Sequence, residues 1–397
     1  MSRTGARFEV AVDEARPVEG QVRRTATITS PALGTQELWY EVDEAHADAL
    51  TDQGDPFVLG ALTLAMTEGR DLVVTGAQVD AALLRNLVEF QRIWQVWFDY
   101  SPIVVHAEPS ARRDAPDAAV VAFSGGADSA HSAWTHTRGG GRYPVAGAMM
   151  IRGIDIPLTD PDGFARASTR ARRMTDSLEL DLVVVATNAW TLPVPIGHYT
   201  GMGVAAALHV LDGRYGTGLI PSTATYRDLV VPLNSSPVSD WMLGGDAFAI
   251  AHDGAAANRF EKLDALTAWP EAMAALRVCL VDPAHDRNCG ECHKCMMTLA
   301  AFRVLGVEAP CFDRAPTPAE LTAWARRWPS GRYYLQEGLV LVGAARARGV
   351  DEPWVRALRN RIRVAQVKDG VRAAWPGLAD GAASVHRRIA EARSTRR

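Results

Sequence analysis

A short loop between an apolar run and a helical pattern constrains this chain more than any other segment. Residues 124–129, Ser-Gly-Gly-Ala-Asp-Ser, follow the apolar residues 118–123 directly and lead into a helical pattern from Ala130. Adjacent glycines let the backbone approach an anion, serine hydroxyls can donate hydrogen bonds, and a helix N-terminus presents unpaired N–H groups. The segment predicts a strand, a phosphate-binding loop and a helix. A serine- and glycine-rich turn without a ligand is the alternative.

The loop is not of the Walker type, because no lysine follows its second glycine and its glycines are adjacent. A kinase or GTPase of that class is therefore disfavoured. Beyond the loop, the patterns predict a strand at 143–151, a helix at 168–178 and a strand at 182–186. Apolar strands that alternate with helices predict an α/β fold with a parallel sheet and helices on both faces. Asp155 follows the second strand, where ligands of such sheets bind, although an aspartate that caps a turn explains it equally well.

Four of the five cysteines gather in one stretch: Cys279, Cys289, Cys292 and Cys295. In a cytosolic chain this spacing indicates a metal site and not disulfides. Four thiolates leave no open coordination position, so we expect a structural zinc, with an iron–sulfur cluster as the main alternative. His293 could replace one thiolate, but its place inside the knuckle of residues 289–295 disfavours that ligand set. Cys311 is expected to be packed and inert.

The loop pattern Ser-Gly-Gly-x-Asp-Ser resembles the PP-loop of the N-type ATP pyrophosphatases, which cleave ATP to AMP and pyrophosphate while they adenylate a substrate oxygen. A PP-loop followed by Cys-x(9)-Cys-x(2)-Cys-x(2)-Cys, over residues 118–306, is similar to the 7-cyano-7-deazaguanine synthase family. That family adenylates a carboxylate of a deazapurine, and ammonia then displaces AMP. The resemblance implies an adenine nucleotide alpha hydrolase-like (HUP) fold. Long flanking segments imply a divergent relative with its own acceptor.

The resemblance also implies roles for individual residues. The phosphates of ATP would be held by Ser124, Gly125, Gly126 and Ser129. Asp128 would lie near Mg²⁺, and Asp155 near the nucleotide and the acceptor. Lysine-bearing helix starts approach the ATP phosphates in such enzymes, and Arg259 and Lys262 begin a predicted helix here. Three residues apart, they share a helix face and could clamp pyrophosphate, with solvated surface charge as the alternative. The expected catalytic residues are Asp128, Ser129, Arg259 and Lys262.

Three further segments could contribute to a site. The glycine-rich residues 197–203 open a predicted helix and could receive an anion, while close packing of that helix explains the glycines equally well. The hydroxyl-rich loops 220–226 and 232–237 could form an acceptor wall. His252 beside Asp253 could act as a base, although a turn histidine satisfied by the backbone is the safer expectation.

Length and charge indicate more than one domain. A chain of 397 residues predicts an N-terminal α+β domain (1–117), a PP-loop domain (118–309) and a helical C-terminal segment (310–397). From Pro310 onward, 17 Lys+Arg stand against 8 Asp+Glu, whereas the first 309 residues carry 25 basic and 38 acidic side chains. The basic segment could meet nucleic acid, an acidic protein partner or the rest of this acidic chain, and the last is favoured.

The expected activity is that of an AMP-forming, C–N bond-forming ligase with ATP, Mg²⁺ and a structural Zn²⁺. A carboxylate or amide-like oxygen of a small, deazapurine-like acceptor would attack the α-phosphorus, and ammonia or an amine would expel AMP. Sulfur transfer, or modification of a protein or nucleic acid, are the alternatives. No apolar run reaches the ~20 residues that span a bilayer, and the first ten residues hold no apolar signal core. A cytoplasmic protein without a membrane partner is expected.

Overall fold

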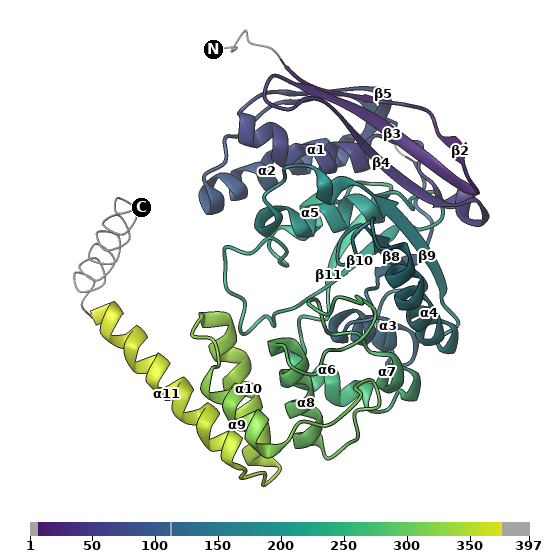
Figure 1. The fold of residues 1–397 in the computed structure, drawn as a ribbon. Helices are drawn as coiled ribbons and strands as arrows, with labels where there is room; N and C mark the ends of the chain where they lie inside the picture. Colours follow the sequence, from purple (N-terminus) through teal and green to yellow (C-terminus); the bar gives the residue numbers. More distant parts are fainter. Residues whose placement is uncertain (1–6, 112, 375–397) are drawn as a thin grey trace, which may run out of the picture. The chain divides into compact units, whose positions relative to one another are not determined.

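The chain folds into two compact units, as a computed structural model shows (Figure 1). The structure describes residues 7–111 and 113–374. The first unit comprises Met1–Phe302 and Val307–Ala315, and the second comprises Arg303–Gly306 and Pro316–Arg397. The boundary predicted at residue 117 falls inside the first unit. The end of the predicted C-terminal segment, residues 375–397, lies outside the described residues.

One sheet of eleven strands runs through the first unit. In chain order the strands are β1 (Phe8–Val12), β2 (Arg16–Val18), β3 (Gln21–Ser30), β4 (Gly34–Asp43), β5 (Leu72–Asp80), β6 (Val105–Ser110), β7 (Ala119–Ala122), β8 (Val145–Arg152), β9 (Asp181–Thr187), β10 (Thr217–Pro221) and β11 (Ala249–Asp253). Across the sheet they follow the order β11-β10-β7-β8-β9-β4-β3-β1-β5-β6, with β2 paired to β3. Six neighbouring pairs are parallel and four are antiparallel. The predicted α/β class is thus confirmed.

The strands from β7 to β11 form a parallel half-sheet with a change of direction beside β7. After β7 the chain adds β8 and β9 on one side, and it then adds β10 and β11 on the other. Open parallel sheets bind ligands at such a switch point, beyond the carboxyl ends of the strands. The short apolar strand β7 is buried, as a central parallel strand must be. The fold therefore places the glycine-rich loop that follows β7 at the position where a ligand is expected.

The strands from β1 to β6 continue the sheet beyond β9, at the edge of the half-sheet opposite β11. β4 pairs antiparallel with β9, with Val42 opposite Val185. The Asn188 side chain prolongs the pairing, because it accepts the N–H of Trp39 (2.9 Å) and donates to the Glu37 carbonyl oxygen (2.8 Å). Buried side chains from both parts of the sheet belong to one core cluster.

The helices of the first unit gather in two groups (Figure 1). Their bounds are α1 (Asp55–Glu68), α2 (Ala81–Phe98), α3 (Ala127–Thr137), α4 (Pro161–Ser177), α5 (Ile196–His209), α6 (Arg259–Leu266), α7 (Pro270–Ala275) and α8 (His293–Leu305), with 3-10 helices η1 (Glu44–Ala49), η2 (Ala189–Thr191) and η3 (Asp240–Leu243). In one group α5 packs on α1, and η3 packs on α2 and α5. In the other α3 packs on α6, and α4 packs on α7.

Helix α2 illustrates how the sequence pattern becomes core. Asp80 caps its N-terminus, since the carboxylate accepts the N–H groups of Ala82 and Leu83. Residues at helical spacing along it are fully buried: Leu83, Leu87, Phe90 and Trp94. Such a stripe anchors the helix by apolar burial.

The second unit contains α9 (Pro318–Arg326), α10 (Arg332–Ala347) and α11 (Pro353–Ala374). These three helices agree with the helical character that was predicted for the segment from residue 310. A groove of about 460 Å³ between α9 and α11 is lined by three arginines, Arg326, Arg356 and Arg361. Every helix in the described part of the chain is too short or too polar to cross a membrane.

Candidate functional site

The conformation of the loop after β7 is stabilised by hydrogen bonds of its own serines. Ser129 Oγ accepts the N–H of Ser124 (3.2 Å) and donates to the carbonyl oxygen of Gly126 (3.1 Å). Gly125 has a φ of 73°, in the left-handed region that favours glycine. Gly126 is the N-cap residue of α3 and makes no side-chain cap. The first N–H groups of α3 therefore lack a capping side chain, an arrangement that suits an anion.

Asp128, in the first turn of α3, pairs with two cations that follow it by more than 130 residues. Arg259 Nη2 lies 2.7 Å from its carboxylate and Lys262 Nζ lies 3.1 Å from it. A capping box fixes the start of α6, so that both cations share the helix face that their spacing predicted. Burial alone would raise the pKa of Asp128, but the charges of Arg259 and Lys262 outweigh it and lower that pKa. The carboxylate is held in its ionised form.

Asp155 and Arg277 form a second ion pair. Arg277 Nη2 lies 3.1 Å from Asp155 Oδ2, and Nη1 donates to the carbonyl oxygen of His285 (3.3 Å). The backbone N–H of Arg277 donates to the carbonyl oxygen of Gly125 in the loop (2.8 Å). The Arg277 side chain is 5% exposed, and its Nε has no hydrogen-bond partner among the described residues. A buried donor of this kind calls for a ligand or an ordered water.

Both ion pairs line one cavity of about 350 Å³, which we call the anion cavity. Six of the predicted site residues line it: Ser124, Gly126, Asp128, Ser129, Asp155 and Arg259. Gly125 belongs to the same loop, and Lys262 reaches Asp128 from α6. The volume is that of a small-molecule site.

Positive charge exceeds negative charge around the anion cavity. Three cations line it: Arg259, Arg277 and Lys294. A fourth, Lys262, forms an ion pair with Asp128, which also lines the cavity. The carboxylates of Asp128 and Asp155 oppose them, which leaves an excess of two positive charges. Burial lowers the pKa of Lys294, and Arg259 acts in the same direction, while both carboxylates oppose the shift. A cavity with this balance attracts an anion.

One side of the anion cavity is polar but uncharged. Thr223, Asn234 and Ser235 line it from the two loops that were predicted as an acceptor wall, together with Thr200 and Gly201 of α5. A Cβ at Gly201 would lie 2.3 Å from the carbonyl oxygen of Asn234, so the loop packs directly on this helix. Helix α5 begins at Ile196, earlier than predicted, because the glycines belong to its first turns. At Gly201, close packing is the reason for the glycine.

His252 and Asp253 do not pair with each other. They are consecutive residues of β11, so their side chains point to opposite faces of the sheet. His252 Nδ1 lies 2.8 Å from Asp240, and Asp253 pairs with His136 Nε2 at 3.0 Å. Asp240 also accepts the hydroxyl of Ser235 (2.7 Å). His252 therefore bonds to Asp240, and not to Asp253 or to the backbone as predicted, and Asp240 links it to the polar wall.

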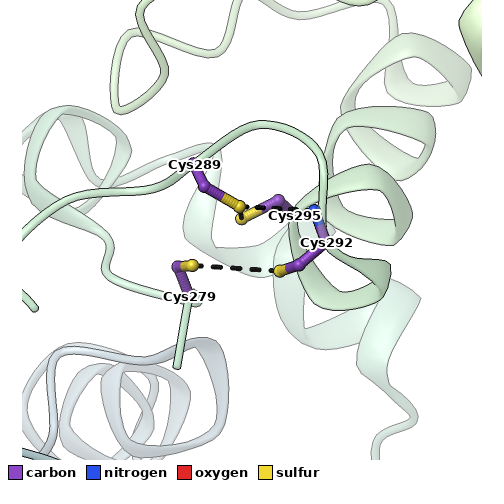
Figure 2. Close-up of side chains that lie close together, drawn as sticks. All are labelled: Cys279, Cys289, Cys292 and Cys295. Atoms are coloured by element: carbon purple, nitrogen blue, oxygen red, sulfur yellow. Dashed lines mark hydrogen bonds between the residues drawn. The ribbon is translucent and has the colours of Figure 1, made fainter. Parts of the chain in front are cut away.

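The four cysteines predicted as metal ligands meet at one point, the cysteine cluster (Figure 2). Their sulfurs lie within 4.8 Å of one another, with 3.9 Å between Cys279 and Cys292 and 3.8 Å between Cys289 and Cys295. Four sulfurs placed tetrahedrally at ~2.3 Å from zinc lie about 3.8 Å apart, so the cluster can hold this ion. A disulfide would need about 2.05 Å. His293 is not part of the cluster.

Thiol chemistry differs between the cysteine cluster and Cys311. The hydrogen bond between Cys292 and Cys295 lowers the pKa of Cys292 and raises that of Cys295, and burial raises the pKa of Cys289, so Cys292 is the favoured thiolate of these three. Cys311 is buried, and burial raises its pKa to about 12. It lines a separate cavity of about 720 Å³ beside arginines of α4. The expectation of a packed, inert thiol agrees with this environment.

Arg277 and Lys294 are the charged cavity residues that the sequence patterns did not place in the site. Both are embedded in the cysteine motif: Arg277 precedes Cys279 by two residues, and Lys294 directly precedes Cys295. The only signal in the sequence was that each of these cations lies close to a predicted metal ligand. This signal points to the anion cavity only if the cysteine motif and the glycine-rich loop lie at the same edge of the sheet.

Comparison of the chain with protein-family models, with curated proteins and with solved structures found no match in any of the three. What the anion cavity and the cysteine cluster can bind is therefore inferred from the residues of these two sites alone.

Proposed function

We propose that the protein is an AMP-forming ligase of the PP-loop type. It would bind ATP in the anion cavity, adenylate a carboxylate or amide-like oxygen of a small acceptor, and release pyrophosphate. Ammonia or an amine would then attack the activated carbon and expel AMP. Similarity to the 7-cyano-7-deazaguanine synthases is part of the proposal, with an acceptor of its own.

One observation carries the proposal: the glycine-rich loop lies at the switch point of the parallel half-sheet, and four cations surround it. Loop N–H groups, the unpartnered Nε of Arg277 and the excess positive charge all suit a polyphosphate. Apolar side chains from β8, α5 and β10, among them Met150, Val204 and Ile220, line the rest of the cavity. They suit the base of a nucleotide and limit the access of water to an activated acceptor.

Asp128 and Asp155 are the residues that would hold Mg²⁺, because protein sites for this ion combine one or two carboxylates with the phosphates of a ligand. In the structure both carboxylates pair with cations. Phosphate oxygens would compete for Arg259 and Arg277 and release the carboxylates. Bound Mg²⁺ would neutralise part of the negative charge of the phosphates.

Other residues would orient the phosphates, stabilise the leaving group and bind the acceptor. The loop N–H groups and Ser129 would orient the phosphates, and Arg259 and Lys262 would stabilise the charge of the departing pyrophosphate. Asn234 and Ser235, which line the uncharged wall of the cavity, would bind the acceptor. No thiol lines the anion cavity in the described part of the chain, and nitrogen is therefore the proposed nucleophile.

The direct test is to identify the nucleotide product by chromatography. The purified protein would be given ATP, Mg²⁺ and ammonium with a panel of small carboxylates that includes 7-carboxy-7-deazaguanine. AMP and pyrophosphate that appear with one acceptor would establish adenylation and name the substrate class. ADP with every acceptor would reject the proposed chemistry.

Sulfur transfer is the weaker alternative, because the one cysteine outside the cluster is buried away from the anion cavity. The variant C311S distinguishes the two chemistries. Amidation predicts unchanged AMP formation, whereas sulfur transfer through this thiol predicts its loss.

A macromolecular acceptor is the second candidate, and the arginine-lined groove of the second unit favours it. Guanidinium groups in such a groove bind phosphate oxygens of nucleic acid or carboxylates of a protein. Binding of RNA that weakens steeply with salt would support a nucleic-acid acceptor. AMP formation with a small carboxylate alone would argue against any macromolecular acceptor.

A further inference from the structure

A single asparagine connects the two segments that supply the cysteine cluster: residues 276–279, which include Cys279, and residues 289–295, which include the other three cysteines. Asn288, next to Cys289, accepts the N–H groups of Val278 (2.9 Å) and Cys279 (3.2 Å) and donates to the carbonyl oxygen of Leu276 (2.8 Å). Asn288 is buried, so these hydrogen bonds are shielded from water. The segment that supplies the first cysteine is thus fixed to the knuckle that supplies the other three.

The same segment forms part of the anion cavity and contacts its loop. The N–H of Arg277 donates to the carbonyl oxygen of Gly125 (2.8 Å), and the Arg277 side chain pairs with Asp155 (3.1 Å). Arg277 and Val278 both line the cavity. One residue separates Arg277 from Cys279, so a displacement of that cysteine would move a wall of the cavity and a contact of the loop together.

The cysteine cluster also carries a cation of the anion cavity. Lys294 lies between Cys292 and Cys295, at the start of α8, and its side chain lines the cavity. Asp155 and Asp128 line the same cavity. Metal bonds to Cys292 and Cys295 would fix the backbone on both sides of this lysine.

We propose that the metal centre is a working part of the anion cavity: bound metal holds residues 276–279 and Lys294 in position for the phosphates, and Lys294 contacts a phosphate of bound ATP. The inference rests on the proposed ATP site and goes beyond it, because a structural metal needs no influence on ligand binding. It assigns to Lys294 a binding role that the loop motif does not include.

The first test compares ATP binding by metal-loaded and metal-stripped protein. Full-length protein is purified, its metal content is measured, and half is stripped with a chelator and checked for folding by circular dichroism. ATP and inorganic pyrophosphate are then titrated by calorimetry without Mg²⁺. The stripped protein should bind both at least tenfold more weakly, a difference of about 1.4 kcal/mol. Binding should return with one equivalent of Zn²⁺.

The second test changes the lysine and keeps the metal ligands. K294Q should retain its metal and lose about tenfold in ATP affinity, since a charge-assisted hydrogen bond is removed. K294R keeps the charge and should recover most of the affinity. R287Q is the matched control: Arg287 lies near the same knuckle, but its side chain is 58% exposed and outside the anion cavity. It should bind ATP like the wild type.

The outcomes separate the two proposals. Equal ATP affinity in loaded, stripped and K294Q protein would overturn the role of the metal centre and leave the ATP site standing. Failure of the metal-loaded protein to bind either ATP or pyrophosphate would overturn both. If the stripped protein unfolds, K294Q alone decides, because its four cysteines are intact.

Discussion

Two carboxyl groups, the buried Asp55 at the start of α1 and the partly buried Asp128 at the start of α3, shift their pKa values in opposite directions. Asp55 is 1% exposed, and burial raises its pKa to about 7. Its Oδ1 accepts the N–H of Asp80 (3.0 Å), while Oδ2 has no hydrogen-bond partner among the described residues. Asp128 is also withdrawn from water, yet its pKa is lowered because Arg259 and Lys262 pair with it.

The difference shows where this chain maintains ionised groups. Burial raises the pKa of both carboxyl groups; the neighbouring carboxylates Asp212 and Asp80 add to this rise at Asp55, whereas the paired cations reverse it at Asp128. Those cations come from α6, far along the chain, and they gather where the loop and the parallel half-sheet meet. Charges that are concentrated and paired inside a cavity are typical of ligand sites, whereas the fully buried carboxyl group of Asp55 belongs to the protein interior.

The largest effect is expected when Asp128 loses its carboxylate. In D128A the buried Lys262 and the partly buried Arg259 lose their partner, so AMP formation should fall at least about 10³-fold and the free energy of unfolding by about 3 kcal/mol. Product chromatography and urea unfolding measure the two effects. D162A is the control, because Asp162 also lies in the first turn of a helix, α4, but is exposed. Undiminished AMP formation by D128A would remove Asp128 from the site.

A smaller, pH-dependent effect is expected at Asp55. Its folded-state pKa of about 7 lies above the ordinary value of 3.8 for an aspartate, so the folded state binds the proton more tightly. The stabilisation is fully present below about pH 4 and is lost as the pH rises to about 7, by up to about 4 kcal/mol. D55N should lack this loss and be the more stable protein at pH 8.

Urea unfolding of wild type and D55N at several pH values between 4 and 8 tests this. The Asp128 carboxylate should act in the opposite sense, because its lowered pKa gives stability that is present above pH 3.8 and lost in acid. Identical pH dependence for wild type and D55N would show that the two carboxyl groups are not distinguished in this way.

The smallest effect is expected on the uncharged wall. S235A removes a hydrogen bond to Asp240 and a hydroxyl oxygen that can accept a hydrogen bond from the acceptor, which should raise the KM of the acceptor about fivefold and leave the KM of ATP unchanged. Steady-state kinetics with each substrate varied separately would show this. S239A is the control, since Ser239 bonds to Ser236 and does not line the cavity. A rise in the KM of ATP for S235A would place the nucleotide on this wall instead.

Local patterns were enough to predict several parts of the molecule. The glycine-rich loop lies between a strand and a helix because each of these elements is specified by neighbouring residues. The cysteine spacing predicted a cluster, and the spacing of Arg259 and Lys262 predicted a shared helix face. In each case the signal and the structure lie within a few residues of one another.

Long-range pairing limited the rest of the prediction. Nothing in β4 or β9 marks them as neighbours, because an apolar strand pairs equally well with many others. The partner of His252 came from η3, since the alternation of a strand fixes which face a residue occupies but not what lies there. Arg277 and Lys294 entered the anion cavity only because the fold brings the cysteine motif to the loop.

The most direct measurement follows an oxygen atom. The acceptor carboxylate found in the chromatographic screen is labelled with ¹⁸O, and the nucleotide product is analysed by mass spectrometry. Attack of the carboxylate on the α-phosphorus predicts one ¹⁸O atom in AMP for each turnover. Label in inorganic phosphate with formation of ADP, or unlabelled AMP, would contradict adenylation of the acceptor in the anion cavity.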